Sequence, residues 1–190
     1  MAKWAKLSII ILLCMALCAC SSKSEASKDD IAQEYSGFSE ISVCADVTAD
    51  CGDSIFEYGM KYSGSDVRGT ITITAPESIA GLEIKADSAS GETKLVYDGA
   101  ELMAGELNEE GLNPVSAIPM MITQWKSGYV SEAQTELLDG AKLTALTYLI
   151  SDETNLKTWF DPDTLLPYRA EIVTNGKTVV FCSFQDVTIN

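Results

Sequence analysis

Apolar and polar residues alternate with a period of two along most of the chain. The alternation begins after Glu40, and its clearest segments are residues 41–48, 56–62, 70–74 and 82–87. Such alternation predicts strands with one apolar face and one solvent-exposed face, and it favours antiparallel pairing. The dipeptides Asp98-Gly99 and Asn175-Gly176 lie between strand-like runs and suit two-residue hairpin turns. The runs therefore predict a meandering antiparallel sheet of roughly eight to eleven strands.

A short helix is predicted before the first strand. Ser27 and Asp30 have the spacing of a capping box, with aspartate in place of the usual glutamate. Ile31, Tyr35 and Phe38 then recur at helical spacing, so they share one apolar face. An amphipathic helix beside a one-sided sheet is expected to cover the apolar face of that sheet.

A second helix interrupts the strand pattern at residues 113–128. Asn113 is a suitable N-cap and Pro114 a suitable first helical residue. Pro119 is expected to kink or split this helix, because proline lacks a backbone donor. The predicted order is helix, sheet, central helical lid and more sheet, which defines an α+β fold.

The N-terminus predicts export and a lipid anchor. Lys3 and Lys6 precede an uncharged run from Leu7 to Ala19, which as a helix reaches only roughly 20 Å. That length is typical of a signal peptide rather than a membrane span. The following "LCAC", ending at Cys20, resembles a bacterial lipobox. The resemblance implies that Cys20 carries fatty acyl chains such as palmitate and becomes the mature N-terminus.

Three regions follow from this interpretation. Residues 1–19 are the lipoprotein signal peptide, residues 20–27 the lipidated cysteine with a flexible tether, and residues 28–190 a single domain. The expected location is the extracytoplasmic face of the cell membrane, with the lipid anchor as the membrane contact. Acylation by two chains stabilises such attachment where one chain is marginal.

Charge and composition exclude several function classes. The chain of 190 residues carries 28 acidic and 13 basic residues, a net charge of -15, and has no histidine. An acidic surface disfavours nucleic acid and anionic membranes as partners. Absence of histidine removes Ser-His-Asp and Cys-His catalysis and histidine-based zinc sites. Because no calcium-loop or C-x-x-C motif is present either, we expect no metal and no cofactor.

The cysteines of the mature chain leave two interpretations open. Cys44, Cys51 and Cys182 remain after the signal peptide is removed, so at least one thiol is free. Cys44 and Cys51 would bridge the ends of neighbouring strands, or all three would be small buried apolar residues.

The C-terminal third carries a motif that resembles LolA-like proteins, the lipoprotein-carrier superfamily. The motif is W-x-D-P-x-T-x-L-P-x-R-x-E, formed by Trp159, Asp161, Pro162, Thr164, Leu166, Pro167, Arg169 and Glu171. The resemblance implies an incomplete antiparallel barrel whose helices cover an apolar concavity. Because the chain carries a lipobox, it looks more like the lipid-anchored clostridial members of that superfamily, which include germination lipoproteins of the GerS type. Those are implied to be protein partners of the amidase that modifies spore-cortex peptidoglycan.

Apolar and aromatic residues supply the candidate binding site. They are Phe56, Tyr58, Met60, Tyr62, Met103, Ile118, Met120, Met121, Ile122, Trp125 and Trp159. They form either a pliable cavity under the helical lid, for an acyl chain or an apolar segment of a partner, or a filled core. Arg169 either anchors an acidic partner or lipid headgroup, or pairs with Glu171 or another acid.

The sequence thus predicts a non-enzymatic, lipid-anchored envelope protein that binds a lipophilic ligand or a protein partner. One alternative is an envelope hydrolase that uses carboxylates, which requires converging acids with raised pKa values. Another is a scaffold that pairs strands through an exposed sheet edge, as a homodimer or with a partner.

Overall fold

Eleven strands and two α-helices make up the part of the chain that the computed structural model describes, residues 26–65, 68–87, 92–103 and 112–190. The first strands are β1 (Ile41–Asp50), β2 (Ile55–Gly64), β3 (Arg68–Ala75), β4 (Glu83–Asp87), β5 (Glu92–Tyr97) and β6 (Ala100–Met103). The later strands are β7 (Val130–Leu138), β8 (Ala141–Leu149), β9 (Thr154–Phe160), β10 (Pro167–Thr174) and β11 (Lys177–Ile189). The helices are α2 (Lys28–Ser36) and α3 (Pro114–Ser127), and a short 3-10 helix, η2, spans Glu77–Ile79.

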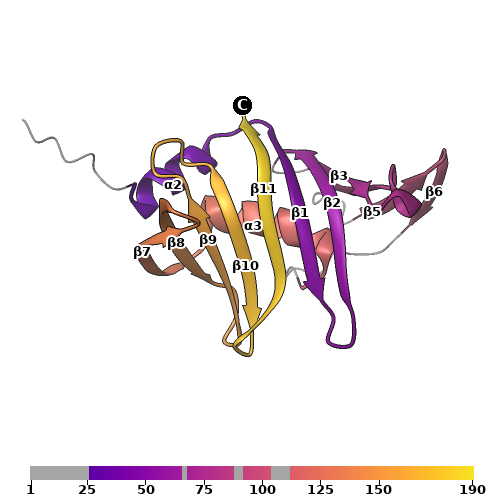
Figure 1. Ribbon diagram of the computed structural model, residues 1–190. Coiled ribbons are helices and arrows are strands. Elements are labelled where there is room, and N and C mark those ends of the chain that lie inside the picture. Colours follow the sequence, from indigo (N-terminus) through magenta and orange to yellow (C-terminus); the bar gives the residue numbers. More distant parts are fainter. Residues whose placement is uncertain (1–25, 66–67, 88–91, 104–111) are drawn as a thin grey trace, which may run out of the picture.

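The strands form one antiparallel sheet in the order β6–β5–β4–β3–β2–β1–β11–β10–β9–β8–β7 (Figure 1). Each half of the sheet is a meander, and the halves join where β1 pairs with β11, from Ile41↔Ile189 to Ala49↔Val180. Within the described residues β6 and β7 are the two edges, so the sheet remains open. The expected fold class is confirmed: an incomplete antiparallel barrel with an N-terminal and a central helix.

The central strand β1 shows how alternation positions the core. Its apolar side chains are 0–3% exposed, whereas those between them are half-buried or exposed; the buried ones are Ile41, Val43, Ala45, Val47 and Ala49. Successive side chains of a strand point to opposite faces, so this pattern directs one face of the sheet toward the helices.

Backbone conformation at the turns explains the hairpins. Asp98-Gly99 and Asn175-Gly176 both adopt positive φ angles, with Asp98 at 47° and Asn175 at 51°, as a type I′ turn requires. The two predicted hairpins are therefore confirmed. A third turn of the same kind, Asp139-Gly140, has φ angles of 52° and 83° and joins β7 to β8. The sequence analysis did not single out this turn.

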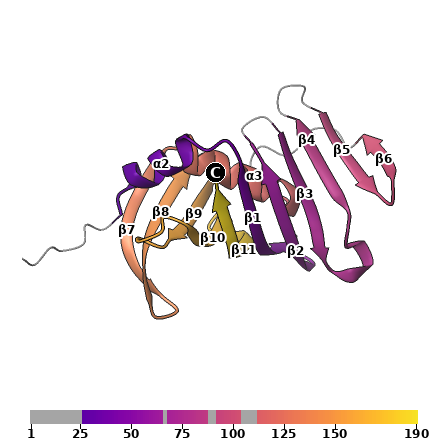
Figure 2. The ribbon, with the colours of Figure 1, turned by 90° about the horizontal axis from the view of Figure 1, so that it is seen from above.

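Both helices cover the same face of the sheet (Figure 2). The capping box of α2 is complete: the Ser27 hydroxyl accepts a hydrogen bond from the Asp30 N–H, and the Asp30 carboxylate accepts one from the Ser27 N–H. Ile31 and Tyr35 of α2 are fully buried, and α2 packs against α3. The predicted capping box is thus confirmed, and so is the apolar face at Ile31 and Tyr35, whereas Phe38 is buried but lies beyond the end of α2.

The central helix α3 is continuous through Pro119, so of the two outcomes expected there the split does not occur. Asn113 caps α3 by accepting a hydrogen bond from the Ser116 N–H, and Pro114 is its first residue, as predicted. The helix is not split, however, because it continues through Pro119 to Ser127. Proline at this position removes only the bond to the carbonyl of Val115. Burial of seven α3 side chains offsets that loss.

Candidate functional site

An aromatic cluster fixes α3 to the sheet. Trp125 is 1% exposed, and its ring centroid lies 5.3 Å from Tyr35 of α2, 5.8 Å from Phe160 of β9 and 5.5 Å from Phe184 of β11. All three contacts are edge-on, the geometry that aromatic pairs favour. The Trp125 indole N–H donates to the hydroxyl of Thr158 at 3.0 Å, so its buried polar atom is satisfied. These side chains occupy the space beneath the C-terminal half of α3.

Most predicted site residues come together in this helix-covered core. One continuous cluster contains Met60, Tyr62, Ile118, Met120, Met121, Ile122 and Trp125, and Tyr58 packs at its margin. Phe56 lies near the β1–β2 turn, is 45% exposed and stacks on Tyr58 with centroids 6.5 Å apart. Met103 lies on the edge strand β6 and is 64% exposed, so it does not join the cluster.

Trp159 lies on the opposite face of the sheet. It packs with Leu143 and Ala145 of β8 in a second, smaller cluster. Its neighbour Phe160 belongs to the helix-covered core. The period of two contained this signal, because it groups Trp159 with Lys157 and groups Phe160 with Leu156 and Thr158.

Glu136 of β7 organises the polar side of this second cluster. Its carboxylate accepts hydrogen bonds at 2.6 Å from the Trp159 indole N–H and from the Lys157 ammonium, and Lys157 lies 4.8 Å from the Trp159 ring centroid. Partial burial acts to raise the pKa of Glu136, but the hydrogen bonds from Lys157 and Trp159 outweigh burial and hold the pKa below its ordinary value.

The motif of the C-terminal third builds the β9–β10 turn. One oxygen of Asp161 accepts hydrogen bonds from the Asp163 N–H, the Thr164 N–H and the Thr164 hydroxyl, at 2.9, 2.9 and 3.2 Å. Leu165 adopts a positive φ of 59°, and its carbonyl accepts a bond from the Tyr35 hydroxyl at 3.4 Å. These motif residues therefore shape the turn and attach it to α2.

Arg169 attaches the β7–β8 turn to the outer face of the sheet. Its guanidinium donates to the Asp139 carboxylate at 3.0 Å and lies 5.1 Å from the centroid of the Phe181 ring. The Tyr168 hydroxyl donates to the same carboxylate oxygen at 3.4 Å. Of the two interpretations of Arg169, the structure supports pairing with an acid, and that acid is Asp139 rather than Glu171.

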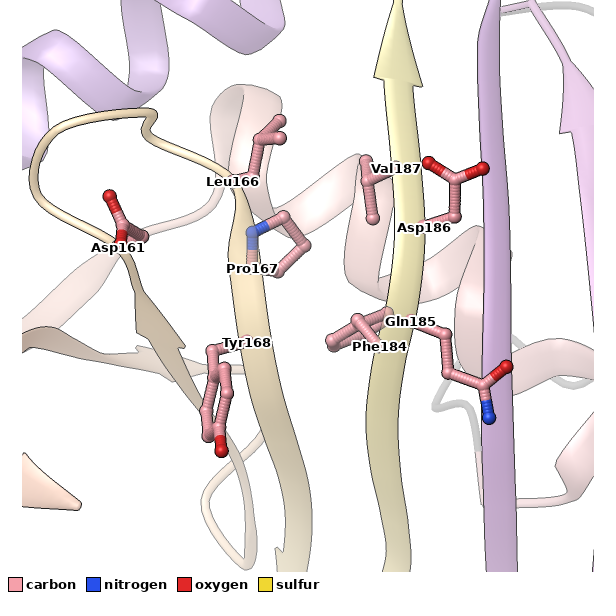
Figure 3. A pocket seen from close by; sticks show the side chains of 8 residues that line it. All are labelled: Asp161, Leu166, Pro167, Tyr168, Phe184, Gln185, Asp186 and Val187. Atoms are coloured by element: carbon pink, nitrogen blue, oxygen red, sulfur yellow. The ribbon is translucent and has the colours of Figure 1, made fainter. Parts of the chain in front are cut away.

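A crevice of about 200 Å³ opens where β10 and β11 diverge (Figure 3). Its apolar walls are Leu166, Pro167, Tyr168, Phe184 and Val187. This site was not among the predicted ones. It depends on where the β10–β11 ladder ends, and no local pattern encodes that position.

Three described carboxyl groups have pKa shifts opposite in direction to the shift that a general acid needs. Asp30, Asp50 and Glu136 have pKa values held below the ordinary range, in each case by hydrogen bonds, whereas a general acid needs a raised pKa. No group of three potential metal-ligating side chains occurs in residues 26–65, 68–87, 92–103 and 112–190.

Both interpretations of the mature cysteines are wrong: Cys44 and Cys51 form no bridge, and of the three only Cys182 is buried, because Cys44 is half-buried and Cys51 is exposed. The three described cysteines are free thiols. Cys44 lies in β1 and Cys51 directly follows that strand, so seven residues of extended chain, roughly 23 Å, separate them. A disulfide needs Cα atoms within about 7 Å of each other. Cys182 is fully buried, and burial raises the pKa of its thiol to about 12.

No protein-family model matches the chain, and no curated protein matches it. Solved structures do. An uncharacterized conserved protein from Thermus thermophilus has 8% identity and a TM-score of 0.51, over 85% of this chain and 84% of that chain. An outer membrane lipoprotein-sorting protein domain from Vibrio parahaemolyticus has 10% identity and a TM-score of 0.49, over 86% and 94%. A LolA superfamily protein from Nitrosomonas europaea has 11% identity and a TM-score of 0.39, over 87% and 94%.

At these identities the likeness to the Thermus protein shows a shared fold. None of the helices in the described ranges combines the length and apolar character that crossing a membrane requires.

Proposed function

We propose that the protein is a lipid-anchored, non-catalytic binding protein of the cell envelope, and that its domain holds a partner polypeptide. The observation that carries this proposal is the packing beneath α3. Met121, Trp125 and Phe160 are 0%, 1% and 0% exposed, so within the described residues the chain's own side chains, and not a lipid, occupy the space beneath the C-terminal half of α3. A filled core leaves the surface of the open sheet for recognition.

The attachment point supports a membrane-bound role. Cys20 of the lipobox precedes Ala26 by six residues, which span at most roughly 20 Å when extended. The Thr144 hydroxyl of β8 donates to the Ala26 carbonyl at 3.5 Å, so the chain enters the domain beside the β7–β8 edge. An anchor at Cys20 would therefore put the β7–β8 edge nearer the membrane than β6, which lies at the far edge of the sheet (Figure 1).

The finer proposal is an accessory role beside an amidase that modifies spore-cortex peptidoglycan. It is supported by the resemblance of the Trp159–Glu171 motif to LolA-like proteins and by the lipobox, which the lipid-anchored germination lipoproteins of that superfamily share. In that role the acidic domain would present a cell-wall enzyme at the membrane surface, and a cationic partner surface would be favoured by charge.

Substitution of the anchor residue tests the location. Cys20→Ala is expected to move the protein from the membrane fraction to the soluble envelope fraction. Cys18→Ala is the matched control, because Cys18 lies in the segment expected to leave with the signal peptide. Continued tight membrane association of Cys20→Ala would contradict the anchor.

Native mass spectrometry of the extracted lipoprotein tests the binding class. A retained polypeptide is the expected result. A retained lipid in place of a polypeptide would contradict the proposal and favour a carrier-type function. Retention of no species at all would also overturn the proposal.

A further inference from the structure

Among the residues that the structure describes, no strand covers one internal edge of β11. On one side β11 pairs with β1 as far as Ile41↔Ile189. On the other side its ladder with β10 ends at the pair Arg169↔Ser183, and Pro167 of β10 pairs only with β9. Strands direct alternate backbone groups to each side. Residues 184–189 of β11 therefore direct some of their N–H and C=O groups away from β1 and toward the gap.

The crevice lies in this gap, and five of its eight lining residues are apolar or aromatic. Leu166 and Pro167 on one side face Phe184 and Val187 on the other (Figure 3). The side chain of Gln185 lies on the β1 side of the strand and donates a hydrogen bond to Asp46. An incoming group would thus contact apolar side chains together with the exposed backbone of β11.

The size of the crevice limits what can enter it. Pockets for whole small molecules typically measure about 300–1,000 Å³. A volume of about 200 Å³ is smaller and suits a single side chain of medium size. An uncovered strand edge next to a side-chain pocket is the combination by which proteins recognise extended peptides.

Charge indicates which peptides fit. The polar residues that line the crevice are Asp161, Gln185 and Asp186, and none of its lining residues is basic. The whole chain has a net charge of -15. Lysine or arginine residues flanking the inserted side chain would therefore be attracted to the rim.

We propose that the β10–β11 gap binds a basic, extended segment of a partner polypeptide, which pairs with β11 at residues 184–189 and inserts one apolar side chain between Pro167 and Val187. This inference rests on the proposed function, because it identifies the place where the partner polypeptide binds.

Hydrogen exchange of the extracted lipoprotein locates the site. The probe is an acetylated and amidated hexapeptide that alternates valine with lysine, and the control peptide carries glutamate in place of lysine. We expect the lysine peptide to slow exchange of backbone amides in residues 184–189, and the glutamate peptide to leave them unchanged. Absence of protection at millimolar peptide, or protection only at β6 or β7, would overturn the proposal.

Variants of the crevice test the inserted side chain. Leu166→Trp fills the crevice and Val187→Thr adds a hydroxyl without changing its shape, and each is expected to weaken lysine-peptide binding by about tenfold. Leu149→Trp is the matched control, since Leu149 is an exposed leucine at the far end of β8. Unchanged affinity in both crevice variants, with thermal unfolding as in the parent protein, would contradict insertion.

The two proposals fail differently. If native mass spectrometry detects a bound polypeptide but residues 184–189 stay unprotected, the partner binds elsewhere and only this inference fails. If no polypeptide is retained, the proposed function itself fails.

Discussion

At the scale of single residues, the polar atoms of the large aromatic side chains account for much of the specificity of packing. The Trp125 indole donates to Thr158 in the helix-covered core, and the Trp159 indole donates to Glu136 on the opposite face. Each tryptophan thus joins two elements and satisfies its own donor. Burying an indole N–H without a partner would cost about 1–3 kcal/mol.

Glu136 makes folding stability depend on pH. Its pKa in the folded protein lies below the ordinary value of 4.5, so its contribution to stability is present above that value and is lost as the pH falls through the lowered pKa. Glu136→Gln is expected to lower the free energy of unfolding at pH 7, and the difference from the parent should shrink toward about pH 3. Urea titration at both pH values measures this.

Glu132→Gln is the control for that experiment, because Glu132 lies on the same strand and is exposed. It should change stability little at either pH. A difference between Glu136→Gln and the parent that is equally large at both pH values would refute a role for the Glu136 charge.

At the scale of elements, the turns and caps follow local chemistry, whereas α3 departs from it at Pro119. The helix continues through this residue although proline removes one backbone hydrogen bond. Packing against the sheet therefore outweighs the local preference. This is the usual outcome when tertiary contacts and propensity disagree.

Replacing the internal proline should strengthen α3. Pro119→Ala gives residue 119 a backbone N–H that can donate to the carbonyl of Val115. We expect the free energy of unfolding to rise by about 1–3 kcal/mol. Pro114→Ala is the matched control, because proline at the first helical position has no bond to lose. Chemical denaturation measures both; a Pro119→Ala protein no more stable than its parent would show that the missing bond has little cost.

At the scale of the whole molecule, the sheet is long compared with the proposed tether, residues 20–27. Eleven strands at about 4.8 Å spacing give roughly 48 Å along the sheet from β7 to β6. If Cys20 is the anchor, as proposed, the chain enters the domain beside β8, so the two edges should lie at different heights above the membrane. The same geometry leaves the β10–β11 gap, between these edges, within reach of a partner in the envelope.

Fluorescent labels at the two edges test this orientation in the membrane-bound lipoprotein. Ala133→Cys on β7 and Ala100→Cys on β6 are both exposed positions, each combined with Cys51→Ser to remove the exposed native thiol. A nitroxide-bearing lipid should quench the β7 label more strongly than the β6 label. Equal quenching would exclude the proposed orientation.

Much of this fold is determined by local sequence. Alternation along β1, the Ser27–Asp30 capping box and the Asn175-Gly176 turn each act within a few residues, so the strands, helix ends and hairpins can be predicted directly. The lipobox at Cys20 is equally local, and it alone underlies the proposed anchor.

Only the tertiary structure decided which distant residues meet. The β1–β11 pairing joins strands from opposite ends of the domain, and the Arg169–Asp139 contact joins β10 to the β7–β8 turn. Local alternation separates Trp159 from Phe160, but only the assembled sheet shows which of them the helices cover. The crevice likewise exists because the β10–β11 ladder ends at Ser183. Such contacts depend on strand register and packing summed over the whole sheet, which short sequence patterns do not contain.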